Sequence, residues 1–391
     1  MSRIKIAFFS DVLVRDFDGA LRTVFNIIDR IPDDIFEIEF FCGMAPTDHF
    51  TYKVHRLPTI KIPLNSSYQM VLPQLVKKKL NNVLENFDPD IIHVTTPSPM
   101  GNFAVKYGNK HQIPVSTIYH THFISYVDYY FRYLPFLIPR ARRRSLQITK
   151  SIYDGCDRIF VPTKEMIKDL GDAGAKTDNM VLWPRGIDKS IFHPERANRQ
   201  KLQEITGNDY PNVLFASRLV WEKNLKTLIR FYKLVKKEKL KLNLILAGDG
   251  VARKDLENKM PDAFFLGNVN QTELAEIYAS SDVFLFPSIS ETYENVVIEA
   301  MSCGLSFVIA NGGGSKSFIN HGENGFLCKP NEEQEYLDYV KKIINSPELK
   351  QTLRQNSLHY VKDLSWSALI KEYFNQLVEL HNKNSDQTEA V

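Results

Sequence analysis

Residues 282–305 read DVFLFPSISETYENVVIEAMSCGL and divide into a strand, a polar loop and a helix. The apolar run DVFLFP predicts a buried strand, and VVIEAMSCG predicts a short helix that ends at Gly304. The backbone N–H groups in the first turn of a helix have no hydrogen-bond acceptor within the helix, and they therefore attract anions. The segment therefore predicts a strand–loop–helix unit with an anion site above the sheet.

Two carboxylates flank this anion site. Glu291 lies in the loop and Glu299 lies eight positions later, in the helix. Carboxylates do not bind phosphate, but they accept hydrogen bonds from sugar and ribose hydroxyls. Two glutamates at this spacing also occur by chance, so the pair alone is a weak indication. Together with the anion site, it suggests a pocket for a nucleotide sugar.

Short apolar runs alternate with longer amphipathic runs along the chain, which predicts an α/β fold of βα units around parallel sheets. The predicted strands are IKIAFFS, FEIEFFC, DIIHVTT, PVSTIYH and RIFVPT in the first half, and NVLFAS, NLILAG, DAFFLG, VFLFPS, SFVIAN and GFLC in the second. A charged stretch with prolines, residues 183–200, separates the halves. We therefore expect domains at 1–195 and 196–391, with the active site where the carboxyl ends of their strands face each other.

The 391-residue chain is 43% apolar and 24% charged, which is typical of a soluble globular protein. No apolar run approaches the ~20 residues of a membrane span, and the N-terminus does not have the pattern of a signal peptide. The four cysteines are widely spaced, so we expect reduced thiols and a cytoplasmic location. A net charge of +3 gives no indication of a nucleic-acid partner.

Four further segments follow one another in a recognisable order: SRLVWEKN (217–224), LNLILAGDG (242–250), FFLGNV (264–269) and GGG (312–314). With the glutamate loop, this combination resembles the retaining glycosyltransferases of family 4 over nearly the whole chain. The resemblance implies the GT-B fold, in which two Rossmann-like domains with parallel sheets face each other. It also implies that the last helix, at about residues 365–383, returns to the N-terminal domain.

Within SRLVWEKN, the resemblance implies that Arg218 and Lys223 neutralise the diphosphate of the donor and act in catalysis. Negative charge accumulates on the departing nucleoside diphosphate, so fixed cations favour the transition state over the ground state. We expect both side chains on a solvent-facing loop after the first strand of the second half. A merely solvated basic loop is the alternative.

The same resemblance assigns further donor-binding roles. It implies that Glu291 contacts the sugar hydroxyls and acts in catalysis. It also implies that Glu299 contacts the ribose, the amides of Asn295 and Val296 the phosphate, Val269 the base, and Gly19 the reacting sugar. One position departs from the family pattern, because Glu294 stands where a glycine is usual. Its side chain restricts the backbone from positive φ values. Its carboxylate adds negative charge near the diphosphate, unless the side chain points to solvent.

The segment YHTHF (119–123) resembles the motif of family members that glycosylate membrane lipids, and this implies a catalytic contact of His120 with the donor sugar. His120 and His122 would share one face of a strand and could hold a metal, but no third ligand is evident. WPRGID (183–188) resembles a variant found in phosphatidylinositol-mannoside mannosyltransferases and sulfoquinovosyl lipid synthases. Arg185 would then face the acceptor or brace the hinge.

An Asp-x-Asp motif, Asp88-Pro89-Asp90, is the metal-binding signature of other glycosyltransferases. Here it lies between a predicted helix and the strand that follows, which is the wrong end of the sheet for a donor site. We therefore expect no metal site, no cofactor and a metal-independent reaction.

An aromatic segment, YVDYYFRYLPFLIP (126–139), precedes four arginines at positions 140, 142, 143 and 144. Aromatic residues beside clustered arginines are typical of segments that lie on anionic lipid. A solvated helix end is the alternative. We expect a peripheral association with the inner face of the cell membrane.

Together these features predict a retaining transferase that moves a hexose from a GDP- or UDP-linked donor to a hydroxyl of a glycolipid or glycan. The mannosyl-type motifs favour GDP-mannose. Two alternatives are a sugar-nucleotide epimerase of the same fold and a nucleotide-sugar binding protein without turnover.

Overall fold

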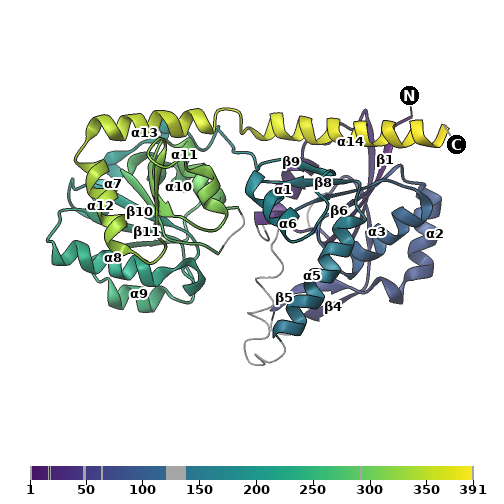
Figure 1. Cartoon of the computed structure of the whole chain (residues 1–391), viewed down its shortest axis with the longest axis horizontal. Coiled ribbons are helices and arrows are strands. Elements are labelled where there is room, and N and C mark those ends of the chain that lie inside the picture. Colours follow the sequence, from purple (N-terminus) through teal and green to yellow (C-terminus); the bar gives the residue numbers. More distant parts are fainter. Residues whose placement is uncertain are drawn as a thin grey trace. The chain divides into compact units, whose positions relative to one another are not determined.

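The computed structural model describes residues 2–15, 17, 19–46, 50–62, 65–119, 138–290 and 293–389. The chain forms two compact units (Figure 1). Unit 1 comprises Met1–Arg185 and Ser367–Val391, and unit 2 comprises Gly186–Trp366.

Unit 1 contains a parallel seven-stranded sheet in the order β3-β2-β1-β6-β7-β8-β9. Its strands are β1 (Ile4–Val12), β2 (Phe36–Met44), β3 (Lys53–Arg56), β6 (Ile91–Val94), β7 (Val115–Ile118), β8 (Arg158–Val161) and β9 (Met180–Leu182). A separate antiparallel pair is formed by β4 (Thr59–Ile62) and β5 (Asn65–Val71). The helices are α1 (Gly19–Ile28), η1 (Pro73–Leu75), α2 (Lys77–Phe87), α3 (Pro99–His111), α5 (Ile138–Asp154), α6 (Lys164–Asp172) and α14 (Trp366–Glu389).

Unit 2 contains a parallel six-stranded sheet in the order β12-β11-β10-β13-β14-β15. Its strands are β10 (Asn212–Ala216), β11 (Asn243–Ala247), β12 (Phe264–Gly267), β13 (Val283–Phe286), β14 (Ser306–Ala310) and β15 (Gly325–Cys328). The helices are η3 (Pro194–Arg196), α7 (Arg199–Thr206), η4 (Trp221–Lys223), α8 (Leu225–Lys237), α9 (Arg253–Lys259), α10 (Gln271–Ser280), α11 (Asn295–Ser302), η5 (Gly314–Phe318), α12 (Glu333–Ile344) and α13 (Pro347–Tyr360).

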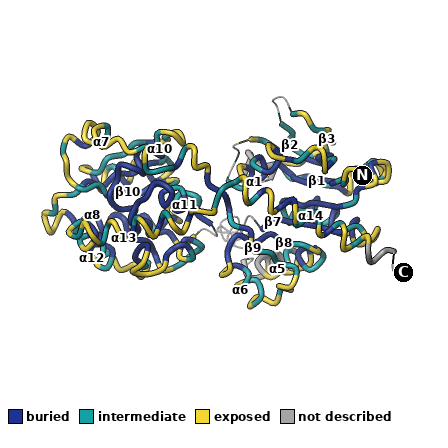
Figure 2. The backbone as a smooth tube through the Cα atoms, turned by 90° about the horizontal axis from the view of Figure 1, so that it is seen from above, coloured by how far each residue is buried: buried dark blue, intermediate teal, exposed yellow. Residues whose placement is uncertain are grey.

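In both units the inner strands are buried along all or most of their length, as Figure 2 shows. Strands such as β13, with the sequence VFLF, have no exposed face because helices pack on both sides of the sheet. This explains why the strands appear in the sequence as continuous apolar runs rather than alternating patterns. The α/β prediction with two parallel sheets is confirmed.

The C-terminal helix α14 packs on unit 1. Tyr373 places its hydroxyl 3.1 Å from Nδ1 of His93 in β6, and the Phe374 ring lies 5.0 Å from that of Phe36 in β2. His93 is completely buried, and this burial lowers its pKa to about 3, so the ring stays neutral near pH 7. The predicted return of the last helix to the first domain is therefore present.

The two units divide between Arg185 and Gly186, ten residues before the boundary that we expected at residue 195. The intervening residues join unit 2 because Phe192 lies in its core and the Ile187 amide donates to the Leu364 carbonyl at 2.8 Å. Gly186 lies so close to Trp366 that an added Cβ would be 2.6 Å from the indole ring. The polar composition of this stretch concealed these contacts.

Candidate functional site

Arg218 and Lys223 follow the carboxyl end of β10, the strand between β11 and β13. Two glycines hold the loop after β11 directly against this segment. An added Cβ on Gly248, whose φ is +132°, would lie 2.0 Å from the Ser217 carbonyl oxygen, and one on Gly250 would lie 2.5 Å from that of Leu219. These contacts explain the glycines of the LAGDG segment and fix the main chain that carries Arg218.

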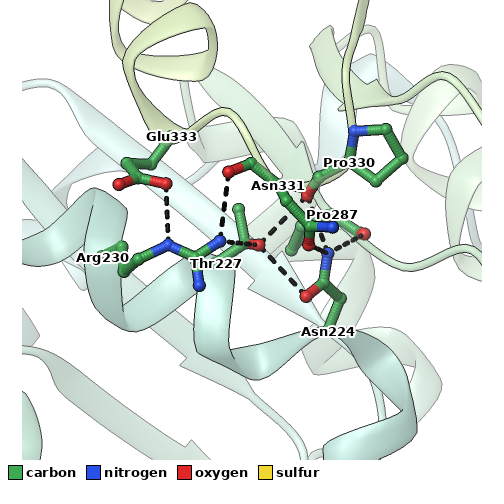
Figure 3. Close-up of polar contacts among 7 residues, drawn as sticks. All are labelled: Asn224, Thr227, Arg230, Pro287, Pro330, Asn331 and Glu333. Atoms are coloured by element: carbon green, nitrogen blue, oxygen red, sulfur yellow. Dashed lines mark hydrogen bonds and ion pairs between the residues drawn. The ribbon is translucent and has the colours of Figure 1, made fainter.

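Asn224, directly after Lys223, links this segment to two other strand ends, as Figure 3 shows. Its φ of +56° is in the left-handed region, which asparagine tolerates better than most residues. Its amide nitrogen donates to the carbonyls of Pro287 after β13, at 3.2 Å, and Pro330 after β15, at 2.8 Å. The backbone at Lys223 is therefore held relative to the neighbouring strand β13.

Three residues that the sequence analysis did not single out extend this network in Figure 3. Thr227 Oγ1 donates to Pro330 O at 3.0 Å and lies 3.0 Å from Nη2 of Arg230. Arg230 in turn pairs with Glu333 of α12, with 2.7 Å between Nε and Oε2. Thr227 and Arg230 lie one helical turn apart on α8. Only the fold shows that they contact residues more than 100 positions later in the chain.

The Arg218 side chain is 64% exposed and pairs at 3.1 Å with Glu222, four residues later. An exposed pair of this kind contributes little to stability. The exposure of the Arg218 side chain agrees with the prediction that it faces solvent.

Lys223 differs from this expectation. Its side chain is 2% exposed, and Nζ lies 2.7 Å from Oε1 of Glu294, whose side chain is 10% exposed. The prediction that both cations face solvent is therefore wrong for Lys223, because the start of α11 covers it. The suggestion that Glu294 points to solvent is also wrong, since its side chain is largely buried and its carboxylate pairs with the buried ammonium.

Glu294 is the N-cap of α11 and has φ −103° and ψ 101°. This is extended backbone that any residue adopts, so the position does not require glycine. The replacement of the usual glycine therefore alters the charge of the site and not the path of its main chain.

The first turn of α11 carries Asn295 and Val296, both half-buried, and Glu299 follows on the same helix. The loop before α11 is constrained on its other side by the loop after β14, because an added Cβ on Gly313, with φ +62°, would lie 2.7 Å from the Ile289 carbonyl oxygen. The predicted phosphate and ribose contacts of these residues stay predictions. Glu291 lies outside the described residues.

The predicted base region follows β12. The Gly267 carbonyl accepts a hydrogen bond of 2.7 Å from the Gly248 amide, and this bond links the ends of β11 and β12. Val269 is half-buried against the core of unit 2, two residues before α10 begins. The structure thus brings Val269, Arg218, Lys223 and the start of α11 to one edge of one sheet.

In unit 1, Gly19 is the first residue of α1, which follows β1. Arg185 is buried, with 7% exposure, and is the last residue of the first segment of unit 1. His120 and His122 lie outside the described residues. The catalytic role of His120 and the donor contact of Gly19 stay predictions.

A residue that the sequence analysis missed, Asp11, lies completely buried at the carboxyl end of β1. Its carboxylate accepts hydrogen bonds of 3.0 Å from the Val71 amide and from Oγ1 of Thr96. Burial raises the pKa of Asp11 from its ordinary value. Its only signal in the sequence is an acidic residue inside an apolar strand, and in the fold it anchors the end of β5 and the loop after β6.

The Asp-x-Asp motif has a structural role. Asp88 ends α2 with φ +50°, and Asp90 Oδ2 accepts the Lys5 amide hydrogen bond at 2.8 Å, so both residues precede β6. Among the described residues, no group of three or more His, Cys, Asp or Glu side chains is arranged to hold a metal ion. All four cysteines are buried and unpaired by disulfides.

Comparisons with known proteins identify the family of the chain. The family model described as "Glycosyltransferase Family 4" matches residues 17–191, and "Glycosyl transferases group 1" matches residues 197–359. The chain belongs to glycosyltransferase family 4. Together the two matches cover both halves of the chain, including the Arg218 loop and the glutamate loop.

Three curated relatives are similar over most of the chain. A GDP-mannose-dependent alpha-mannosyltransferase of Corynebacterium glutamicum is 28% identical over 84% of this chain and 76% of its own length. Sulfoquinovosyl transferase SQD2 of Arabidopsis thaliana is 30% identical over 79% of this chain and 60% of its own. Alpha-monoglucosyldiacylglycerol synthase of Acholeplasma laidlawii is 23% identical over 98% of each chain. The predicted likeness to mannosyl- and sulfoquinovosyltransferases is confirmed.

Among solved structures, sucrose-phosphate synthase from Thermosynechococcus elongatus superposes with a TM-score of 0.74 at 19% identity, over 97% of this chain and 100% of that one. The predicted GT-B fold is confirmed. None of the helices in the described part of the chain combines the length and apolarity that crossing a bilayer requires.

Proposed function

We propose that the protein is a retaining hexosyltransferase that uses a nucleotide diphosphate sugar as donor. One observation carries this proposal: Lys223, after β10, lies 2.7 Å from the N-cap residue of α11, after β13. A cation and a helix N-terminus are thereby joined at the carboxyl ends of neighbouring strands. This is the position at which α/β sheets bind ligands, and both groups favour phosphate.

The chemistry follows from the leaving group. When the bond between the sugar and the β-phosphate breaks, negative charge grows on the phosphate oxygen, and Arg218, Lys223 and the first turn of α11 are the groups that stabilise it. We propose that this oxygen then accepts the proton of the acceptor hydroxyl. The new glycosidic bond forms on the face from which the phosphate departs, so the configuration at the anomeric carbon is retained.

We propose GDP-mannose as donor and a glycolipid or glycan hydroxyl as acceptor. The GDP-mannose-dependent relative supports the donor, and the relative that synthesises monoglucosyldiacylglycerol supports a lipid-linked acceptor. WPRGID, the mannosyl-type motif that includes Arg185, is consistent with the same choice. We propose a metal-independent reaction in the cytoplasm, without a cofactor.

Donor use is tested by measuring release of nucleoside diphosphate from a panel of nucleotide sugars, with and without EDTA. We expect the highest rate with GDP-mannose and no loss on chelation. The product should be an α-linked mannoside. No release from any donor would reject the transferase proposal, and an epimerised nucleotide sugar would favour the epimerase. Inactivation that added metal reverses would overturn the metal-independent mechanism.

We further propose that unit 1 contacts an anionic membrane surface through helix α5. This helix carries four arginines in its N-terminal part, and Arg140 and Arg143 are exposed. The aromatic residues 126–137 that led to this prediction lie outside the described residues.

Replacing Arg142, Arg143 and Arg144 by alanine should weaken sedimentation with anionic vesicles steeply, because each arginine near such a surface contributes about 1 kcal/mol. A matched control replaces Lys77, Lys78 and Lys79, three exposed cations of α2 in the same unit. This control should bind vesicles nearly as the wild type does. Equal losses in both triple variants would show a general charge effect, and unchanged binding would reject α5 as the membrane contact.

A further inference from the structure

Lys223 already has an anionic partner before any donor is bound. Its ammonium and the Glu294 carboxylate form a pair 2.7 Å apart that is almost completely buried. Glu294 belongs to the N-cap of α11, so the carboxylate occupies the region between a cation and a helix N-terminus. A phosphate group is expected to occupy this same region.

We propose that Glu294 determines how tightly this enzyme holds its nucleotide, because its carboxylate competes with the diphosphate for Lys223. The inference rests on the proposed function, since it assumes that Lys223 serves a diphosphate. The phosphate must either displace the carboxylate or share the ammonium with it. Displacement breaks a buried ion pair, and sharing places two anions side by side, so both lower the affinity.

Backbone geometry does not explain the glutamate. The extended φ of Glu294 suits any residue, and its side chain makes no capping hydrogen bond to α11. Lys223, by contrast, is fully covered and would be costly to bury without an anion. The glutamate therefore pairs with the lysine and holds it in place while the site is empty.

The same competition acts on the product. After transfer, the nucleoside diphosphate leaves a lysine that Glu294 can pair again, so the carboxylate favours release. Arg218 differs from Lys223, because its side chain is 64% exposed and its partner Glu222 is 50% exposed. The two cations thus differ in role: Lys223 exchanges partners during the cycle, and Arg218 attracts the phosphates from an exposed position.

The test compares ligand binding by wild type and Glu294→Gln in calorimetric titrations with GDP, UDP, guanosine and uridine. Glutamine keeps an oxygen that accepts the lysine hydrogen bond and removes the charge. We expect Glu294→Gln to bind the diphosphate of the preferred base at least tenfold more tightly, which corresponds to about 1.4 kcal/mol. The affinity for the nucleoside should change less than about twofold, because it has no phosphate to compete.

Glu238→Gln is the matched control, because it removes one negative charge from unit 2 and breaks an exposed pair with Lys341 on α12. It should leave diphosphate affinity unchanged. Glu294→Gly is a second variant that tests the same charge should the glutamine variant fold poorly, and circular dichroism confirms the fold of each.

Unchanged or weaker diphosphate binding in folded Glu294 variants would overturn the inference and leave the proposed function intact. An equal gain for nucleoside and diphosphate would overturn it as well, because the effect would not involve phosphate. If the wild type binds neither diphosphate, the proposed function itself fails.

Discussion

Arg218→Ala should lower kcat by about 100-fold or more, the usual effect of removing one preorganised donor to a transition-state anion. Its stability should change by less than about 1 kcal/mol, because the Arg218 side chain is 64% exposed and its ion pair with Glu222 lies at the surface. Steady-state kinetics with the preferred donor and chemical denaturation measure the two quantities. A fall in kcat exceeding any rise in KM would place the lost interaction in the transition state.

Arg199→Ala is the control for this variant, since Arg199 is 67% exposed and pairs with Asp282 at 3.1 Å. Asp282 precedes β13, so this pair lies at the amino ends of the strands. The control should retain nearly full activity. Near-normal turnover by Arg218→Ala would remove Arg218 from the diphosphate assignment.

Lys223→Met should lose both activity and stability, in contrast to Arg218→Ala. The substitution leaves the Glu294 carboxylate buried without its lysine partner, and breaking a buried pair in this way costs about 3–5 kcal/mol. Urea denaturation measures this loss, and single-turnover donor cleavage measures the chemistry. We expect the methionine variant to be unstable as well as inactive.

The double variant Lys223→Met with Glu294→Leu separates the two effects. Replacing both charges by apolar groups should restore most of the stability, because neither charge then remains buried alone. Activity should stay low, since the cation is still missing. If Lys223→Met is as stable as the wild type, Lys223 and Glu294 do not form a buried charge pair. If the double variant recovers activity, the chemistry does not need Lys223.

Much of the fold could be predicted because buried parallel strands form continuous apolar runs. All six strands of the unit 2 sheet, from β10 to β15, were recognisable in this way. Strands β3 (KVHR) and β9 (MVL) were missed because they are short edge strands, and β3 has exposed ends. Edge strands pair on one side only and need little apolar surface.

The candidate site was predictable in its position and less so in its electrostatics. That Arg218 and Lys223 follow a strand end could be inferred from the local pattern. The burial of Lys223 depends on Glu294, which is 71 residues later and belongs to the neighbouring strand–helix unit. Asn224 likewise acts through carbonyls of Pro287 and Pro330. No local pattern reports which distant group covers a side chain.

The division of the chain into units has a consequence for synthesis on the ribosome. Unit 2 is one continuous stretch, Gly186–Trp366, so every contact within it can form as soon as that stretch has emerged. Unit 1 has to wait, because Tyr373 and Phe374 of α14 cover the aromatic surface around His93 and Phe36. Domains usually complete folding in the order of their synthesis. Here we expect the reverse order: the unit that begins the chain is completed last, and until α14 has emerged its sheet has uncovered apolar surface.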